Sequence, residues 1–279
     1  MSLDIILLIL VAALLHASWN AVIKGGTNKL YETGLNCFGG GVGVLFVVPF
    51  LPLPAPESLI FLAGSCSVHI AYYLCIAVAY RTVDMSFAYT IMRGTAPLLT
   101  SIAMLLFGHN LSWAGWLGIL CLCSGVLVLT RENVRNGRFN ISGALAAVGT
   151  AVVIMGYTLF DGYGARASGN PISYVCWLYV INTFPINIIL LLRQRKSYIP
   201  YFKQRWKIGL FGGLCSLGSY GVALWAMTKA PIAMVAALRE TSVIFGMLLA
   251  ILFLGEKFSP VKLLAVVLVA TGIIIMRLQ

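Results

Sequence analysis

The sequence predicts an all-α integral membrane protein with ten transmembrane helices, arranged as two inverted five-helix repeats. Three observations lead to this fold class. The 279 residues are 60% hydrophobic and 10% charged, whereas soluble domains are about 45–50% apolar and about 25% charged. The apolar residues form runs of the length that a membrane-spanning helix needs, about 20 residues. The second half of the chain also repeats the pattern of the first.

Polar clusters, prolines and glycines separate the predicted helices, and no stretch of the chain is polar enough for a soluble domain. The predicted helices occupy residues 3–24, 31–51, 57–80, 84–106, 111–130, 141–163, 173–192, 207–229, 232–254 and 260–277. The first run lacks a basic region before it and continues toward Lys24, so we expect a retained helix rather than a signal peptide. In the second run, Gly39 and Gly43 have the spacing that lets membrane helices approach closely.

Residues 79–128 resemble residues 226–276 at a shift of 147 positions. At this shift several residues coincide: Gly108 with Gly255, Ser112 with Ser259, Gly125 with Gly272, and Tyr73 with Tyr220. Arg93 meets Arg239 at a shift of 146, which places one residue of slippage between them. Because five helices are an odd number, the second repeat enters the membrane upside down relative to the first. Inverted repeats are typical of alternating-access transporters, whose binding sites lie near the membrane midplane.

The repeats and the charges predict the domain organisation and the orientation of the chain. We expect a first repeat at 1–130, a second at 141–279 and a cytoplasmic linker at 131–140. Fourteen of the 19 lysines and arginines lie in connectors after odd-numbered helices, six of them at 193–207. Basic loops favour the cytoplasmic side, so both termini are expected outside the cytoplasm of a plasma (inner) membrane protein.

The sequence predicts no cofactor, no metal ion and no nucleic-acid partner. It has no Walker motif, its seven cysteines lie in apolar runs, and its three histidines lack a metal-binding spacing such as HExxH. The basic residues do not form the aromatic, basic surface that binds nucleic acids. A membrane-embedded enzyme would need a nucleophile–base or metal constellation. We therefore expect a protein that is not an enzyme.

Two turn motifs resemble those of a known family. "FLGEKFSP" (253–260) ends the ninth predicted helix, and "LFGHNLS" (106–112) is its weaker counterpart. The whole pattern resembles the ten-helix EamA-type form of the drug/metabolite transporter (DMT) superfamily, where a glycine and then an acidic residue are typical of this turn. His109 replaces the acid in the first repeat. The resemblance implies a secondary transporter, which uses no ATP, and leaves the cargo and the direction of transport open.

Three further segments are loosely similar to a branch of that superfamily associated with phosphonate utilisation. They are "LHASWNAVIK" (15–24), "MRGTAPLL" (92–99) and "ALRETSVIF" (237–245). The superfamily resemblance favours export, whereas this looser resemblance favours uptake. The cargo we expect is a small organic anion or zwitterion such as an amino acid or a phosphonate-like metabolite.

Arg93, Arg239 and Glu240 lie near the middle of predicted membrane helices. An arginine at mid-bilayer costs about 2.5–3.5 kcal/mol on insertion scales, so each must face a wet cavity or a partner. Arginine recognises carboxylate, phosphate and phosphonate groups, and two arginines against one acid leave a positive excess. We therefore predict that these residues bind a small organic anion or zwitterion, with Glu240 contacting an ammonium group.

Polar and aromatic residues on other predicted helices are candidates for the rest of the substrate site. His16, Trp19 and Asn20 share one face of the first helix, and Tyr89 lies one turn before Arg93. Tyrosines of the third, sixth and eighth helices could supply hydrogen bonds: Tyr73, Tyr157 and Tyr220. The expected partners are the lipid bilayer and the small substrate, with protons as a candidate coupling ion.

Two other interpretations of these residues stay open. The arginines and Glu240, with Asp161, could form an internal ion-pair network that only holds helices together. Asp161 itself is expected to be a boundary residue near a membrane end. Alternatively, the chain could export cationic or drug-like compounds through Glu240, although the excess of arginine would repel a cationic cargo.

Overall fold

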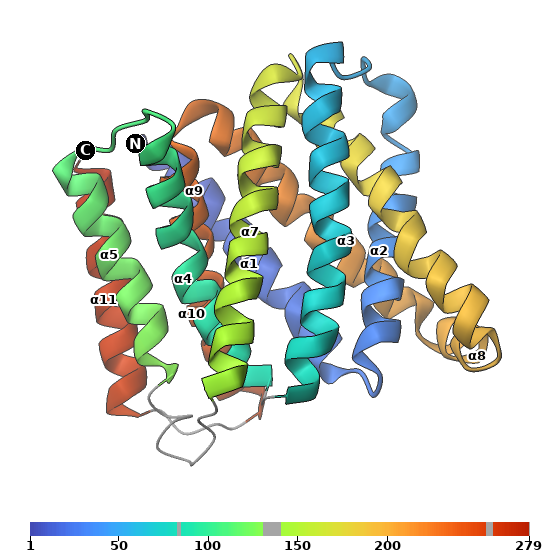
Figure 1. Ribbon diagram of the computed structural model, residues 1–279. Helices are drawn as coiled ribbons and strands as arrows, with labels where there is room; N and C mark the ends of the chain where they lie inside the picture. Colours follow the sequence, from blue (N-terminus) through green and yellow to red (C-terminus); the bar gives the residue numbers. More distant parts are fainter. Residues whose placement is uncertain (83–84, 131–140, 255–258, 279) are drawn as a thin grey trace.

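The computed structural model is built from long helices that cross one another in a single bundle (Figure 1). It describes residues 1–82, 85–130, 141–254 and 259–278, and the side chains of 73–82, 85–89, 250, 253 and 254 lie outside this description. Its α-helices are α1 (Leu3–Gly25), α2 (Lys29–Leu45), α3 (Leu59–Thr82), α4 (Met85–Leu106), α5 (Trp113–Val128), α7 (Ile141–Ala167), α8 (Pro171–Lys229), α9 (Ile232–Arg239), α10 (Ser242–Leu254) and α11 (Pro260–Arg277). Two short 3-10 helices, η1 (Val48–Phe50) and η2 (Pro56–Ser58), lie between α2 and α3.

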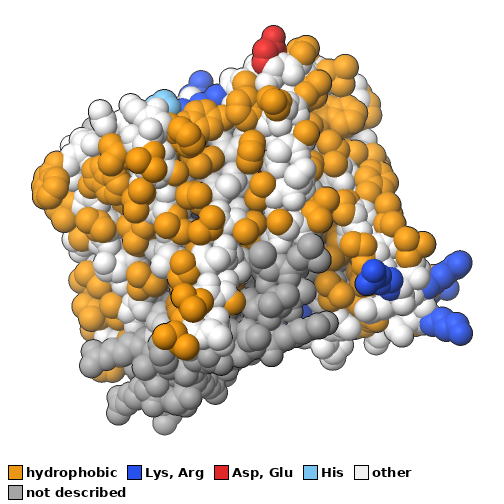
Figure 2. Space-filling view, in the orientation of Figure 1, with side chains coloured by type: hydrophobic (Ala, Val, Ile, Leu, Met, Phe, Trp, Pro, Cys, Tyr) orange, Lys and Arg blue, Asp and Glu red, His pale blue; other side chains and the backbone are white. Residues whose placement is uncertain are grey.

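The surface of the bundle is that of a membrane protein. Within the described residues, six helical segments are long and apolar enough to cross a bilayer: Leu3–Gly25, Lys29–Phe50, Ile141–Ala167, Pro171–Lys229, Ile232–Leu249 and Pro260–Arg277. Hydrophobic side chains cover much of the outer face, and Lys and Arg side chains gather at one lower corner (Figure 2). Both termini lie at the same end of the bundle (Figure 1).

The helix α8 replaces two predicted helices and the connector between them. Its backbone leaves helical geometry at Gln194 (φ −134°, ψ 26°), which divides it into a first arm (171–193) and a second arm (195–229). The connector predicted between 192 and 207 is therefore helical apart from this bend, which corrects the predicted boundaries. Arginine, lysine and glutamine are good helix formers, so a tract rich in them can continue a helix outside the apolar core.

A buried carboxylate fixes the bend of α8 against α2. Glu32, in the first turn of α2, is almost fully buried. The hydroxyl of Tyr201 and the Nε atom of Arg205 both donate to Glu32 Oε1. The second arm of α8 is thereby anchored at its start, and its later residues are directed into the bundle.

The predicted close approach of the second helix is confirmed at the contact between α2 and α8. A Cβ atom at Gly39 would overlap the backbone of Gly209, and one at Gly213 would overlap the backbone of Gly40. The absence of side chains at these positions lets the two backbones touch, which is how small residues bring membrane helices together.

The contacts between α5 and α11 are reciprocal. A Cβ atom at Gly118 would lie 3.0 Å from the carbonyl oxygen of Gly272, and one at Gly125 would lie 2.9 Å from that of Ala265. At the 147-residue shift, Gly118 corresponds to Ala265 and Gly125 corresponds to Gly272. Each residue therefore contacts the counterpart of the other, as residues do across a two-fold axis.

The same two helices begin with equivalent caps. The side chain of Ser112 accepts a hydrogen bond from the amide of Gly115 (3.1 Å), and that of Ser259 accepts one from the amide of Lys262 (3.2 Å). A serine N-cap satisfies one of the free amides at a helix start. Because Ser112 and Ser259 coincide at the 147-residue shift, the two turns end in the same local structure.

Candidate functional site

Arg239 and Glu240 lie where α9 ends and α10 begins, so the prediction of one continuous helix over 232–254 is wrong. The amides of Glu240 and Thr241 donate to carbonyls three residues earlier, at 3.0 and 3.1 Å, which tightens the last turn as in a 3-10 helix. The next helix starts at Ser242. One helix therefore ends and the next begins at these two ionisable residues, and interrupted helices are typical of transporter binding sites.

Glu240 forms a buried ion pair with Arg93 of α4. Arg93 Nη1 lies 3.0 Å from Glu240 Oε1, and the two side chains are only 8% and 5% exposed. The two residues are 147 positions apart, which is the shift that aligns the two halves of the sequence. At the shift of 147, the counterpart of Arg93 is Glu240, its ion-pair partner. The shift of 146, which aligns Arg93 with Arg239, does not correspond to this contact.

The helix that carries Arg93 contains a proline one turn later. Pro97 lies within α4, four residues after Arg93. Proline has no backbone N–H, so the carbonyl of Arg93 does not receive the helical hydrogen bond that another residue at position 97 would donate. The hydrogen-bond ladder of α4 therefore lacks one bond beside the ion pair, although α4 continues to Leu106.

Arg239 joins a second chain of contacts, which reaches α7. The guanidinium carbon of Arg239 lies 4.9 Å from the centre of the Tyr220 ring, a distance suited to a cation–π interaction. The Tyr220 hydroxyl donates to Asp161 Oδ2, and the Tyr174 hydroxyl donates to Asp161 Oδ1 at 3.2 Å. Tyr174 and Tyr220 belong to different arms of α8, so Asp161 connects both arms to α7.

Asp161 is fully buried and lies six residues before the end of α7, so its predicted place near a membrane end stays a prediction. We call Arg93, Glu240, Arg239, Tyr220 and Asp161 the central cluster. It contains two guanidinium and two carboxyl groups, so Asp161 reduces the positive excess that the sequence predicts. The signal that could have found Asp161 is its spacing of four residues from Tyr157, which places both on one face of α7.

His16 lies beside the central cluster on α1. The indole nitrogen of Trp19 donates to His16 Nδ1 at 3.3 Å, and the amide of Asn20 donates to the His16 carbonyl at 2.8 Å. The His16 ring is buried, and α1 packs against both α9 and α10. Trp19 and Asn20 are half-buried, and their hydrogen bonds within α1 position His16.

Four buried polar atoms of this region have no hydrogen-bond partner within the part of the chain that the structure describes. They are Arg239 Nε, Glu240 Oε2, Ser242 Oγ and His16 Nε2. Buried polar groups are nearly always hydrogen-bonded in proteins. A donor on Arg239 and an acceptor on the adjacent Glu240 are therefore available to a small polar ligand.

Of the three remaining tyrosines predicted for the site, the structure describes the side chain of one, Tyr157. Tyr157 is buried, and its ring lies 4.5 Å from that of His69 and 5.7 Å from that of Tyr72, measured between centroids. These contacts are aromatic packing between α7 and α3. The side chains of Tyr73 and Tyr89 lie outside the described residues. Among those described, no group of three or more His, Cys, Asp or Glu side chains could hold a metal ion.

Comparison with known proteins identifies the family. The model of the EamA-like transporter family matches residues 3–131 and 141–278, which is nearly the whole chain. A solved crystal structure has a similar fold, with a TM-score of 0.75 over 100% of this chain and 98% of that chain, at 19% sequence identity. The chain therefore belongs to the EamA-like transporter family, and is a multi-pass membrane transporter of the DMT superfamily.

Proposed function

We propose that the protein is a secondary transporter of a small zwitterion or organic anion, such as an amino acid or a phosphonate-like metabolite. The substrate binds at the central cluster, and the two repeats rock around it to give alternating access. The observation that carries this proposal is the buried Arg93–Glu240 ion pair, which joins repeat-related positions of the two halves of the chain.

The proposal includes ten spans in two inverted repeats, divided as 1–130 and 141–279. In this count of ten, each arm of α8 is one span, and α9 and α10 together form one span. The reciprocal contacts of α5 and α11 support it, as do the matching caps at Ser112 and Ser259. A residue that meets its own repeat counterpart lies close to the pseudo-two-fold axis. Arg93 and Glu240 do so, and binding sites of inverted-repeat transporters lie where the repeats meet.

The unpartnered atoms of the central cluster support ligand binding there. Arg239 Nε is a buried donor and Glu240 Oε2 a buried acceptor, each without a partner among the described residues, and the two residues are adjacent in the sequence. They match the acid group and the ammonium group of a zwitterion. The balance of two guanidinium and two carboxyl groups also favours a zwitterion over a simple anion.

A zwitterion can also insert into the Arg93–Glu240 pair. Its acid group takes the place of Glu240 on the Arg93 guanidinium, and its ammonium takes the place of Arg93 on the Glu240 carboxylate. No buried charge is left unpaired by this exchange, which avoids the several kcal/mol that an unpaired buried ion costs. A cationic cargo would instead leave Arg93 unpaired, so efflux of cations through Glu240 is the weaker alternative.

For the orientation, we propose that both termini lie outside the cytoplasm of the plasma (inner) membrane. The termini share the upper end of the bundle, and the bend of α8, whose basic residues are exposed, lies toward the lower right (Figure 1). A reporter that is active only in the cytoplasm, fused after residue 279, is expected to stay inactive. Activity of that reporter in a properly inserted protein would contradict the orientation.

Solute counterflow tests the transport activity. Liposomes that contain the purified protein are loaded with an unlabelled amino acid and diluted into the labelled compound. We expect transient accumulation of label without ATP, and none in protein-free liposomes. The same experiment with an aminoalkylphosphonate, a simple carboxylate and an organic amine separates the substrate classes. Counterflow of the amine alone would support cation transport and contradict the proposal.

A further inference from the structure

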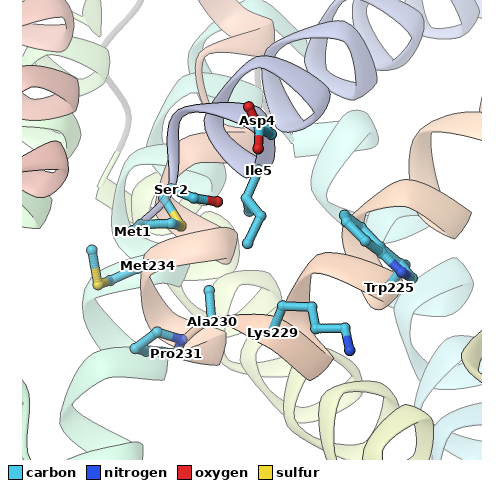
Figure 3. Close-up of a pocket in the computed structure, with 9 residues that line it drawn as sticks. All are labelled: Met1, Ser2, Asp4, Ile5, Trp225, Lys229, Ala230, Pro231 and Met234. Atoms are coloured by element: carbon cyan, nitrogen blue, oxygen red, sulfur yellow. The ribbon is translucent and has the colours of Figure 1, made fainter.

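A cavity of about 670 Å³ opens beside the start of α1, at the end of the bundle that holds the termini. Its walls come from the first residues of α1, the end of α8, the turn to α9, and α9 itself (Figure 3). The cavity is separate from the central cluster, because none of the five residues of that cluster lines it. Its volume is within the range of about 300–1,000 Å³ that is usual for small-molecule sites.

The lining of this cavity has the chemistry of a zwitterion site. It includes one acid, Asp4, and one base, Lys229, which come from different helices and are both exposed. Trp225, Ile5 and Met234 supply apolar surface between them (Figure 3). Opposite charges at separate points of an apolar wall complement a molecule that carries an ammonium and an acid group.

The wall at the end of α8 is held in place by an arginine of α7. Arg166 Nε donates to the carbonyl of Met227 at 2.8 Å, and its Nη2 donates to that of Ala230 at 2.9 Å. These bonds satisfy carbonyls at the C-terminus of α8, where a cation is also favoured by the helix dipole. Lys229 lies between the two carbonyls in sequence, so the backbone that carries it is fixed.

The helices that form the cavity also carry the central cluster. Met234 precedes Arg239 on α9 by five residues, and Trp225 follows Tyr220 on α8 by five residues. At a rise of about 1.5 Å per residue, each step is about 7.5 Å along its helix. The residues between Met234 and Arg239 are all buried, so protein packing separates the cavity from the cluster over this short distance.

We propose that this cavity is the vestibule of the transport pathway, where the zwitterion binds before it reaches the central cluster. Lys229 receives the acid group, Asp4 receives the ammonium group, and Trp225 contacts the apolar part. The substrate then moves inward along α8 and α9 when the packing between the two sites opens. This assignment rests on the proposed function, and adds to it a second binding site and the end of the bundle at which that site opens.

Cysteine labelling tests whether the cavity is wet and holds the substrate. Ile5→Cys places a thiol in the cavity, and Leu8→Cys places one on the same helix at an exposed apolar position outside the lining. A membrane-impermeant thiol reagent is added to open membrane fragments, and mass spectrometry locates the label. We expect reaction at position 5 that slows when the amino acid is present, and little reaction at position 8. An unreactive position 5, or one that the amino acid does not protect, would overturn the vestibule.

Charge substitutions test recognition within the cavity. Asp4→Asn and Lys229→Gln are each expected to raise the KM for the zwitterion several-fold while kcat is kept, because the central cluster is intact. Glu57→Gln is the control, since Glu57 is an exposed acid outside the lining. Unchanged KM values in both variants would overturn the vestibule. Wild-type counterflow is measured in the same preparations, so loss of the vestibule alone is distinguished from failure of the proposed function, in which wild type moves no zwitterion.

Discussion

Replacing Arg93 with alanine is expected to abolish transport and to lower the free energy of unfolding by about 3–5 kcal/mol, because Glu240 is left buried without its ion-pair partner. Counterflow in liposomes measures the first effect. Denaturation of the purified protein in detergent measures the second. A large loss of stability could by itself explain a loss of transport, so the single variant needs a matched companion.

The double variant Arg93→Ala/Glu240→Gln separates stability from function. It removes both charges of the pair, so no unpaired ion remains, and most of the lost stability is expected to return. Transport is expected to stay absent, because the substrate can no longer insert into the Arg93–Glu240 pair, although Arg239 is kept. A stable double variant with wild-type counterflow would show that the Arg93–Glu240 pair only holds helices together.

Glu240→Gln alone is expected to shift the preference of the protein from zwitterions to simple anions. The amide oxygen can still accept the hydrogen bond from Arg93, so the packing of α4 against α9 is kept. The negative charge that receives an ammonium group is lost, so the two guanidinium groups make the site more positive. We expect zwitterion affinity to fall at least about tenfold, which corresponds to ~1.4 kcal/mol, while a carboxylate of the same length binds more tightly.

The control for this shift is Glu32→Gln. Glu32 is a second buried glutamate with an arginine partner, Arg205, among the described residues, and it lies outside the central cluster. Its substitution is expected to reduce stability and to leave the order of ligand affinities unchanged. Thermal shifts with paired ligands, an amino acid and the carboxylate that lacks its amine, measure both variants. An unchanged preference in Glu240→Gln would contradict the role of Glu240 in binding ammonium.

The sequence predicted the class of protein well, because a bilayer imposes long apolar runs separated by turn residues. The family and the membrane class are confirmed by the family match, and the predicted run at 260–277 coincides with α11 (Pro260–Arg277). The end of α9 within a predicted span could not be predicted from the sequence. No proline or glycine marks the end of α9, and only the adjacent Arg239 and Glu240 indicated that the chain departs from a simple span there.

The site was predicted in part, for reasons that concern packing rather than composition. Arg93, Arg239 and Glu240 were identified because charge inside an apolar run is costly, and the ion pair follows the repeat shift of 147. The burial of Asp161 was not predicted, and the predicted helix ended at 163, whereas α7 continues to Ala167. Its burial depends on contacts with both arms of α8, which periodicity within one helix does not reveal.

A thermal-shift comparison of the purified protein tests the central claim most directly. The ligands are an amino acid, its matched carboxylate, its matched amine and an aminoalkylphosphonate, each with wild type and with Arg93→Ala/Glu240→Gln. A ligand at 100 times its dissociation constant stabilises by about 2.7 kcal/mol, which is readily measured. The account predicts that a zwitterion stabilises wild type and not the double variant. Stabilisation of wild type by the amine alone would contradict it and make Glu240 the centre of a cation site.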